Sequence, residues 1–239
     1  MLAALLLALG AIGWFGQERG SADTTPLGLF TSLPILWSDS ADLGAEIAAD
    51  APRHWAKAVL AQHGRVIALD TLANAGPPGP LAGLTRLVMA QPRALSPLEN
   101  VALDDWVRGG GQLLLLADPA LTEDSPLGLG DPRRPLTGVM LSPILARWGL
   151  DLRFDDAQPL EEATRDVMGL GVPVNLPGRF ETRGQANCKL WGDGLAVTCA
   201  IGRGRVIAVA DAALLDRHDP AGTRPRLLSA LLDSAFVAR

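Results

Sequence analysis

The fold is decided by one stretch of the chain, residues 96–119, which reads SPLENVALDDWVRGGGQLLLLADP. Its first four residues form a capping box, with serine at the N-cap, proline at the first helical position and glutamate at the third. Three glycines end the expected helix, and the apolar run that follows is typical of a buried strand. A helix that passes through a glycine stop into a buried strand is half of a βαβ unit. The stretch therefore predicts an α/β fold with a mainly parallel sheet.

The same helix has an apolar face that can be predicted from spacing alone. Leu98, Val101, Ala102 and Trp106 recur at helical intervals, so we expect this face to pack against the sheet. The charged residues are expected largely on the other faces: Glu99, Asp104, Asp105 and Arg108.

Further elements follow from short apolar runs bounded by turn-forming residues. Strands are expected at 27–32, 66–70, 84–90, 152–154 and 205–210. Helices are expected at 52–62, 142–148 and 224–236, with Ser142 as the N-cap of the second. Residues 121–137 form a predicted surface loop, and residues 159–171 carry only a weak pattern.

The two cysteines flank a predicted β-hairpin within residues 180–201. Gly192-Asp193-Gly194 is a strong turn signal between two β-prone runs. A turn centred on Asp193-Gly194 places Cys188 directly opposite Cys199, within disulfide range. A disulfide would indicate an oxidising compartment such as the periplasm. The alternative is a pair of buried free thiols.

The N-terminus and the charge balance bear on location. Met1–Gly16 is uncharged and apolar, so residues 1–22 are expected to be a signal peptide or membrane anchor with a short linker. Residues 23–239 are then expected to form a single domain. The net charge of -5 argues against a nucleic-acid partner. A buried N-terminal helix in a cytosolic protein is the alternative interpretation.

Polar residues follow several of the expected parallel strands: Ser32, Asp70, Gln91, Asp118 and Asp211. Ligands bind in the crevice at the carboxyl ends of such strands, so these five residues are the candidate ligand site. The three carboxylates could also bind a cation or perform acid–base chemistry. Alternatively, an aspartate after a strand caps a helix or fixes a turn.

Motifs for other chemistry are missing from the sequence. No Gly-x-Ser-x-Gly or Gly-x-Cys-x-Gly nucleophile elbow occurs. The three histidines, His54, His63 and His218, lack the spacing of metal ligands and are expected at the surface or in packing roles. Gly202–Arg205 precedes a strand and is interpreted as a turn, not as a phosphate loop. We therefore predict no catalytic residue, metal or cofactor.

Two segments carry a family resemblance. Residues 95–119 resemble the helix–glycine–strand unit of non-catalytic class I glutamine amidotransferase-like domains, and residues 202–212, GRGRVIAVADA, resemble their closing strand. Such domains occur in gliding-motility-type ABC transporter auxiliary proteins and in exported proteins of MoxR-type operons. The resemblance implies a flavodoxin-like three-layer sandwich in an envelope-associated accessory protein. Catalytic relatives carry a cysteine on an elbow with a histidine and glutamate, and this sequence shows neither pattern.

These observations favour an exported or membrane-anchored accessory domain of a bacterial envelope complex, with a membrane or envelope protein as its partner. The small-molecule ligand is not specified by the sequence. The alternative is a hydrolase that uses the strand-end carboxylates Asp70, Asp118 or Asp211, with or without a metal.

Overall fold

The computed structural model of the protein describes residues 24–37, 54–219 and 221–237. Its centre is a seven-stranded sheet in the order β2-β1-β3-β4-β11-β10-β9. The five strands from β2 to β11 are mutually parallel, and β10 and β9 add an antiparallel extension. The parallel strands are β1 (Pro26–Thr31), β2 (Arg65–Ala68), β3 (Arg86–Ala90), β4 (Gln112–Leu116) and β11 (Gly204–Val209). The predicted α/β fold class is confirmed.

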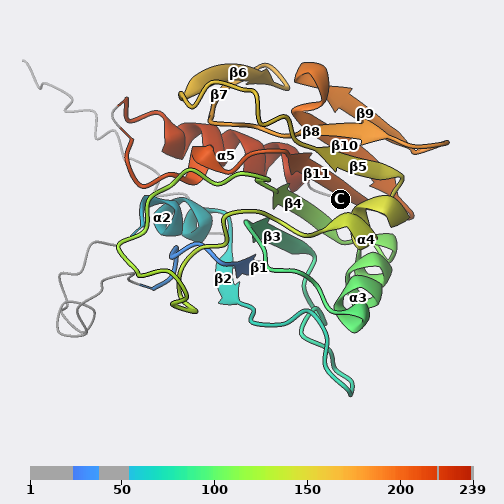
Figure 1. The fold of residues 1–239 in the computed structure, drawn as a ribbon. Helices are drawn as coiled ribbons and strands as arrows, with labels where there is room; N and C mark the ends of the chain where they lie inside the picture. Colours follow the sequence, from blue (N-terminus) through green and yellow to red (C-terminus); the bar gives the residue numbers. More distant parts are fainter. Residues whose placement is uncertain (1–23, 38–53, 220, 238–239) are drawn as a thin grey trace, which may run out of the picture.

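Helices cover both faces of this sheet (Figure 1). On one face, α2 (Trp55–Gln62) and α5 (Arg224–Ala235) pack against the side chains of one buried cluster. On the other face, α3 (Pro97–Arg108) and α4 (Ser142–Arg147) pack against a second cluster. Strand residues alternate between the two clusters because successive side chains point to opposite faces of a sheet. The result is the predicted three-layer sandwich, and its parallel strands have the flavodoxin-like order.

The buried face of α3 differs from the prediction. Leu98 is 66% exposed and Val101 is 51% exposed, whereas Leu103 and Val107 are buried. Two carboxylates share this buried face, namely Glu99 and Asp104. Of the predicted face, Trp106 packs against the core, while Leu98 and Val101 do not. The prediction was wrong for Glu99 and Asp104, because both carboxylates are held in ion pairs that make their burial tolerable.

The Asp104 carboxylate joins α3 to α4. It accepts hydrogen bonds from Arg108, from Arg147 and from the indole of Trp148 at 3.0 Å. Burial raises the pKa of Asp104, but these hydrogen bonds outweigh it and hold the pKa below its ordinary value. The charged form therefore persists at a fully buried position.

Outside the parallel core, two short antiparallel ribbons flank the sheet. The ribbon of β5 (Leu150–Arg153) and β8 (Arg179–Thr182) begins two residues before the predicted strand. The hairpin of β6 (Ala163–Val167) and β7 (Leu170–Val174) occupies the weakly patterned segment. Its exposed residues include Thr164, Arg165 and Asp166, so apolar alternation is too faint to identify the strand.

The cysteine hairpin forms with the predicted register. Strand β9 (Cys188–Trp191) pairs with β10 (Ala196–Ile201), and Cys188 lies opposite Cys199. The two residues form a disulfide with 4.1 Å between their Cα atoms. Between the strands lies a 3-10 turn in which Asp193 has φ 55°.

The N-terminal prediction, covering residues 1–22 and with it the Met1–Gly16 leader, lies outside the described residues, as does the predicted start of α2 at Pro52. Within the described ranges, no helix combines the length and apolar character needed to cross a membrane. Helix α4 begins at Ser142, and its N-cap is Leu141 without a side-chain capping bond, so the predicted Ser142 cap is wrong.

Candidate functional site at the carboxyl edge of the sheet

The order in which the chain adds strands to the sheet reverses at β1. From β1 it passes to β2 on one side, with α2 packing on one face, and it then crosses β1 to form β3 on the other side. The crossing segment carries Leu72, Leu81 and Leu84, which pack on the opposite face. Connections that leave adjacent strands on opposite faces open a crevice at the carboxyl ends, which is where open α/β sheets bind ligands.

A pocket of about 550 Å³ lies at this point. Two predicted site residues, Ser32 and Asp70, line it together with Trp37, Arg93 and Arg134. Its volume is within the range of small-molecule sites. The structure thus brings Ser32 and Asp70 to one cavity, as the strand-end prediction requires.

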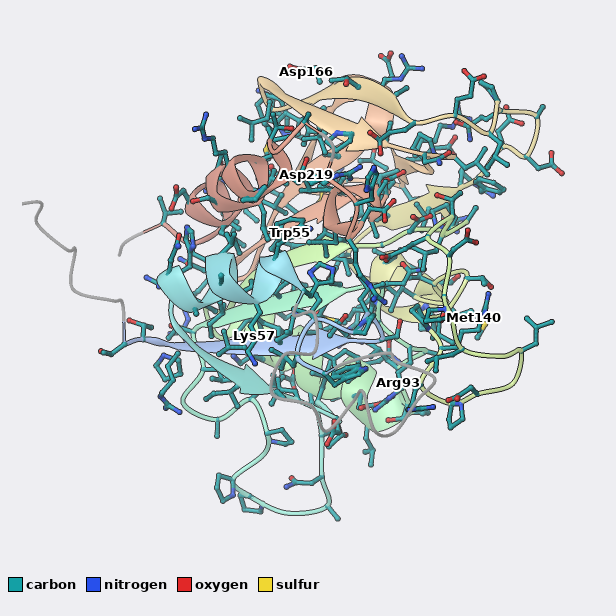
Figure 2. All side chains as sticks on the ribbon, turned by 90° about the vertical axis from the view of Figure 1, so that its left-hand side faces the viewer. Trp55, Lys57, Arg93, Met140, Asp166 and Asp219 are labelled. Carbon is teal, nitrogen blue, oxygen red and sulfur yellow. A yellow bond between two sulfur atoms is a disulfide. The ribbon has the colours of Figure 1, made fainter. Side chains whose placement is uncertain are left out.

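Arg93 forms one wall of this pocket, beside α3 (Figure 2). Its guanidinium lies 4.9 Å from the centre of the Phe30 ring. It also donates two hydrogen bonds to the buried carboxylate of Glu99, at 2.7 and 3.0 Å. The bonds from Arg93, helped by those from Ser96 and Leu72 to Glu99, hold the pKa of Glu99 well below its usual range. Arg93 is therefore a fixed cation at the rim.

Gln91, the third predicted residue, faces the interior. It follows β3 directly, has φ 44° and is fully buried. Its amide nitrogen donates to the main-chain carbonyls of Asp118 at 3.1 Å and Leu136 at 2.8 Å, and its amide oxygen accepts from the main-chain N–H of Asp118 at 3.0 Å. Ser32 extends the network, since its hydroxyl donates to the carbonyl of Gln91 at 2.5 Å. Every amide function of Gln91 is thus used to join β3, β4 and the following loop.

Asp118, which follows β4, is turned toward the backbone. One carboxylate oxygen accepts from the N–H of Ala120 at 2.8 Å, and the other accepts from the N–H of Ala212 at 3.2 Å. Burial raises the pKa of Asp118 to about 6, against the opposing effect of these two hydrogen bonds. The bond to Ala120 has the two-residue spacing of an Asx turn.

Asp211, which follows β11, repeats this arrangement. Its carboxylate accepts from the N–H of Ala213 at 2.6 Å and of Asn175 at 3.0 Å. Burial raises the pKa of Asp211, and the negative charge of Asp118 raises it further by a smaller amount. Each oxygen of both carboxylates therefore binds backbone, and this bonding fits the turn-fixing alternative better than the acid–base one.

Other chemistry-bearing groups have structural roles. His54 is the N-cap of α2: its Nδ1 accepts from the N–H of Ala56, and its Nε2 lies 2.8 Å from the carbonyl of Leu215. Burial lowers the pKa of His54, which favours the neutral ring. Within the described part of the chain, no three His, Cys, Asp or Glu residues are grouped to hold a metal ion.

The strand-end prediction missed the three arginines that line the pocket, namely Arg93, Arg133 and Arg134, of which Arg133 is paired with Asp131. Arg93 lies three residues beyond the end of β3, so a rule that selects the residue directly after a strand does not select it. Arg134 comes from the long loop after β4 and reaches the pocket only through the folded path of that loop. No local sequence pattern predicts that such a residue lines the pocket.

Comparison with protein-family models and with curated proteins gives no match. Among solved structures, the chain is similar to an exo-β-1,4-mannosidase from Opitutaceae bacterium strain TAV5, with 16% identity, a TM-score of 0.49, and coverage of 91% of this chain and 37% of the mannosidase. A β-galactosidase from the Antarctic haloarchaeon Halorubrum lacusprofundi gives 18% identity, a TM-score of 0.48, and coverage of 90% and 31%. The chain thus spans about a third of the length of these glycosidases.

A cytoplasmic protein of Salmonella typhimurium, STM3548, is similar over more of its own length. The match covers 72% of this chain and 80% of the Salmonella protein, with 12% identity and a TM-score of 0.44. All three TM-scores lie below 0.5, so we assign neither a family nor an activity from them.

Proposed function

We propose that the protein is a non-catalytic binding domain of the class I glutamine amidotransferase-like type, acting as an accessory subunit of a bacterial envelope complex. The observation that carries the proposal is Gln91. A nucleophile elbow places its reactive residue in a strained turn directly after a strand. Here the strained position after β3 holds an amide that is fully buried and fully hydrogen-bonded. An unreactive side chain turned inward at this place supports the non-catalytic part of the proposal.

Two features support an envelope location. The disulfide between Cys188 and Cys199 suits an oxidising compartment, because cytosolic reductants keep most thiols reduced. The apolar sequence Met1–Gly16 suits export, either as a cleaved leader or as an inner-membrane anchor. On this proposal the domain resides in the periplasm and serves a membrane protein partner, as in ABC transporter auxiliary or MoxR-operon proteins.

The location is tested by fractionating cells that express the full chain with a C-terminal tag. Free thiols are alkylated before lysis, and the recovered protein is weighed intact by mass spectrometry. We expect the protein in the envelope fraction with Cys188 and Cys199 unalkylated, and alkylated only after reduction. Cytosolic protein with two alkylated thiols would contradict the proposed location.

The accessory role is tested by cross-linking in intact cells, followed by purification of the tagged chain from membranes. We expect enrichment of a defined membrane protein over a Cys188→Ser/Cys199→Ser control that has lost the disulfide. The non-catalytic assignment is tested separately by measuring ammonia release from glutamine. Turnover that depends on Gln91, Asp118 or Asp211 would overturn that assignment.

A further inference from the structure

The pocket at the carboxyl ends of β1 and β2 gathers cationic, aromatic and acidic groups around one cavity of about 550 Å³. We propose that it binds an organic anion that carries a flat ring and hydroxyl groups, the chemistry of a mononucleotide. This inference goes beyond the accessory role: it rests on the pocket alone and holds whichever compartment or partner the domain has.

The anion is favoured by the way two arginines are held. Arg93 is 43% exposed, while its carboxylate partner Glu99 is only 3% exposed. The guanidinium therefore borders the pocket, with the carboxylate of Glu99 buried behind it and the carboxylate of Asp70 on the pocket side. Arg134 is fixed by main-chain carbonyls, with 2.5 Å to that of Leu127 and 3.4 Å to that of Ser125. Carbonyls orient a guanidinium without cancelling its charge, and among the described residues Arg134 forms no ion pair. Both Nη atoms of Arg93 already donate to Glu99 and to the main-chain carbonyls of Ala94 and Asp70. Arg134 uses only one Nη atom and is therefore the guanidinium that can bind a phosphate or carboxylate directly.

The flat ring is favoured by Trp37. This tryptophan is 39% exposed, although tryptophan is normally highly buried. Leu69 and Leu136 also line the pocket, so the aromatic surface adjoins an apolar wall. A planar ring stacked on such an indole contributes about 1–3 kcal/mol in nucleic-acid-binding proteins.

The hydroxyl groups are favoured by Asp70. It lies just after β2, is exposed, and is the single carboxylate among the described residues that line the pocket. In dinucleotide-binding domains an acidic residue in the corresponding crevice accepts hydrogen bonds from ribose hydroxyls. The glycine-rich phosphate turn of those domains has no counterpart after β1, where the sequence reads SLPILW over residues 32–37. Arg134 would take over phosphate binding.

The test is titration of the full-length protein with AMP by calorimetry, alongside adenosine and ribose 5-phosphate. Adenosine lacks the anion and ribose 5-phosphate lacks the ring. We expect AMP to bind with a dissociation constant in the millimolar range or tighter, and each of the other two to bind at least about tenfold more weakly. Equal binding of adenosine and AMP would overturn the anion site.

Matched variants then place the site. Arg134→Gln and Trp37→Ala are each expected to weaken AMP binding about tenfold or more. Arg203→Gln is the control, because Arg203 is also held by a main-chain carbonyl, that of Gly109, but lies at the opposite edge of the sheet, before β11. Unchanged thermal unfolding shows that each variant is folded.

Two results would contradict the proposal. One is the absence of binding by AMP, GMP, UMP and phenyl phosphate at millimolar concentration. The other is AMP binding that survives both pocket substitutions in folded protein. Neither result bears on the compartment or on the membrane partner, so failure here is distinguishable from failure of the accessory role.

Discussion

The carboxyl edge of the sheet has two halves, and similar polar residues have different roles in each. At β1 and β2 the polar residues Ser32 and Asp70 border a pocket, and Asp70 is exposed. At β3, β4 and β11 the polar residues Gln91, Asp118 and Asp211 are at most 2% exposed and bind main-chain groups. A polar residue after a parallel strand is therefore available for a ligand only where the connections from adjacent strands leave on opposite faces of the sheet. The closed half stabilises the fold, and the open half is available for binding.

The largest effect is expected in the closed half, from Gln91→Ala. This substitution leaves the N–H of Asp118 and the carbonyl of Leu136 without their partner, removes one of two donors to the carbonyl of Asp118, and opens a cavity. We expect the free energy of unfolding to fall by about 3 kcal/mol, measured by urea denaturation. Gln158→Ala is the control, because this more exposed glutamine also donates to two carbonyls, those of Asp155 and Pro177, and should lose less than about 1 kcal/mol. Equal losses of unfolding free energy in Gln91→Ala and Gln158→Ala would contradict the structural role assigned to the closed half.

The second effect is a pH dependence that comes from Asp118. Its pKa is about 6 in the folded protein against 3.8 as its ordinary value, so the folded state binds more protons between these values. Stability from this group is then present at low pH and is lost as the pH rises from about 4 to about 6. Glu123, whose pKa burial raises to about 7, adds a decline in the same direction.

Asp118→Asn removes that contribution, together with the part of the raised Asp211 pKa that comes from the Asp118 charge. The variant loses a carboxylate acceptor at every pH, but it should lack about 1–2 kcal/mol of the wild-type decline in unfolding free energy between about pH 4 and pH 7. His54 and Glu99, whose lowered pKa values act in the opposite direction, are common to both proteins and cancel in the difference. Parallel pH profiles would show that Asp118 has no raised pKa.

A smaller effect is expected from Ser32→Ala, because Ser32 borders the pocket of the open half and also bonds to Gln91 of the closed half. The hydroxyl donates to the carbonyl of Gln91 and accepts from the N–H of Leu136 at 3.3 Å. We expect a loss of about 1 kcal/mol in thermal or urea unfolding. Ser142→Ala, at the exposed first position of α4, should change stability by less than about 0.5 kcal/mol, which also checks that Ser142 is not a cap.

The smallest effect on stability is expected in the open half, from Asp70→Asn. Because the side chain is exposed, the free energy of unfolding should change by less than about 0.5 kcal/mol. A loss as large as that of Gln91→Ala would show that Asp70 is a structural residue. Because Asp70 is proposed to bind the ribose hydroxyls, wild-type protein should bind AMP more tightly than 2′-deoxy-AMP, and this difference in affinity should shrink in Asp70→Asn, as measured by calorimetry.

Much of the fold could be predicted because its signals are local. The capping box at Ser96, the glycine stop and the apolar strand that follows form as expected, and the Cys188–Cys199 register follows from the turn at Asp193-Gly194. The face of α3 could not be predicted from spacing. Its orientation depends on Arg93 and Arg147, which neutralise Glu99 and Asp104 and come from other elements.

The lining of the pocket was predicted in part. Placing polar residues at strand ends located Ser32 and Asp70 at the pocket, because all parallel strands finish at one edge. Strand position alone could not show that Gln91 turns inward. That outcome depends on its positive φ and on carbonyls from residues 118 and 136, which are distant in sequence.

The most direct test of the difference between the halves is an amide NMR titration of the full-length protein with AMP. We expect chemical shifts to move at the ends of β1 and β2 and around Arg93 and Arg134, with the amides of Ala120, Ala212 and Ala213 unchanged. Shifts confined to those alanine amides, beside Asp118 and Asp211, would place the ligand at the closed half and contradict the structural role assigned to its carboxylates.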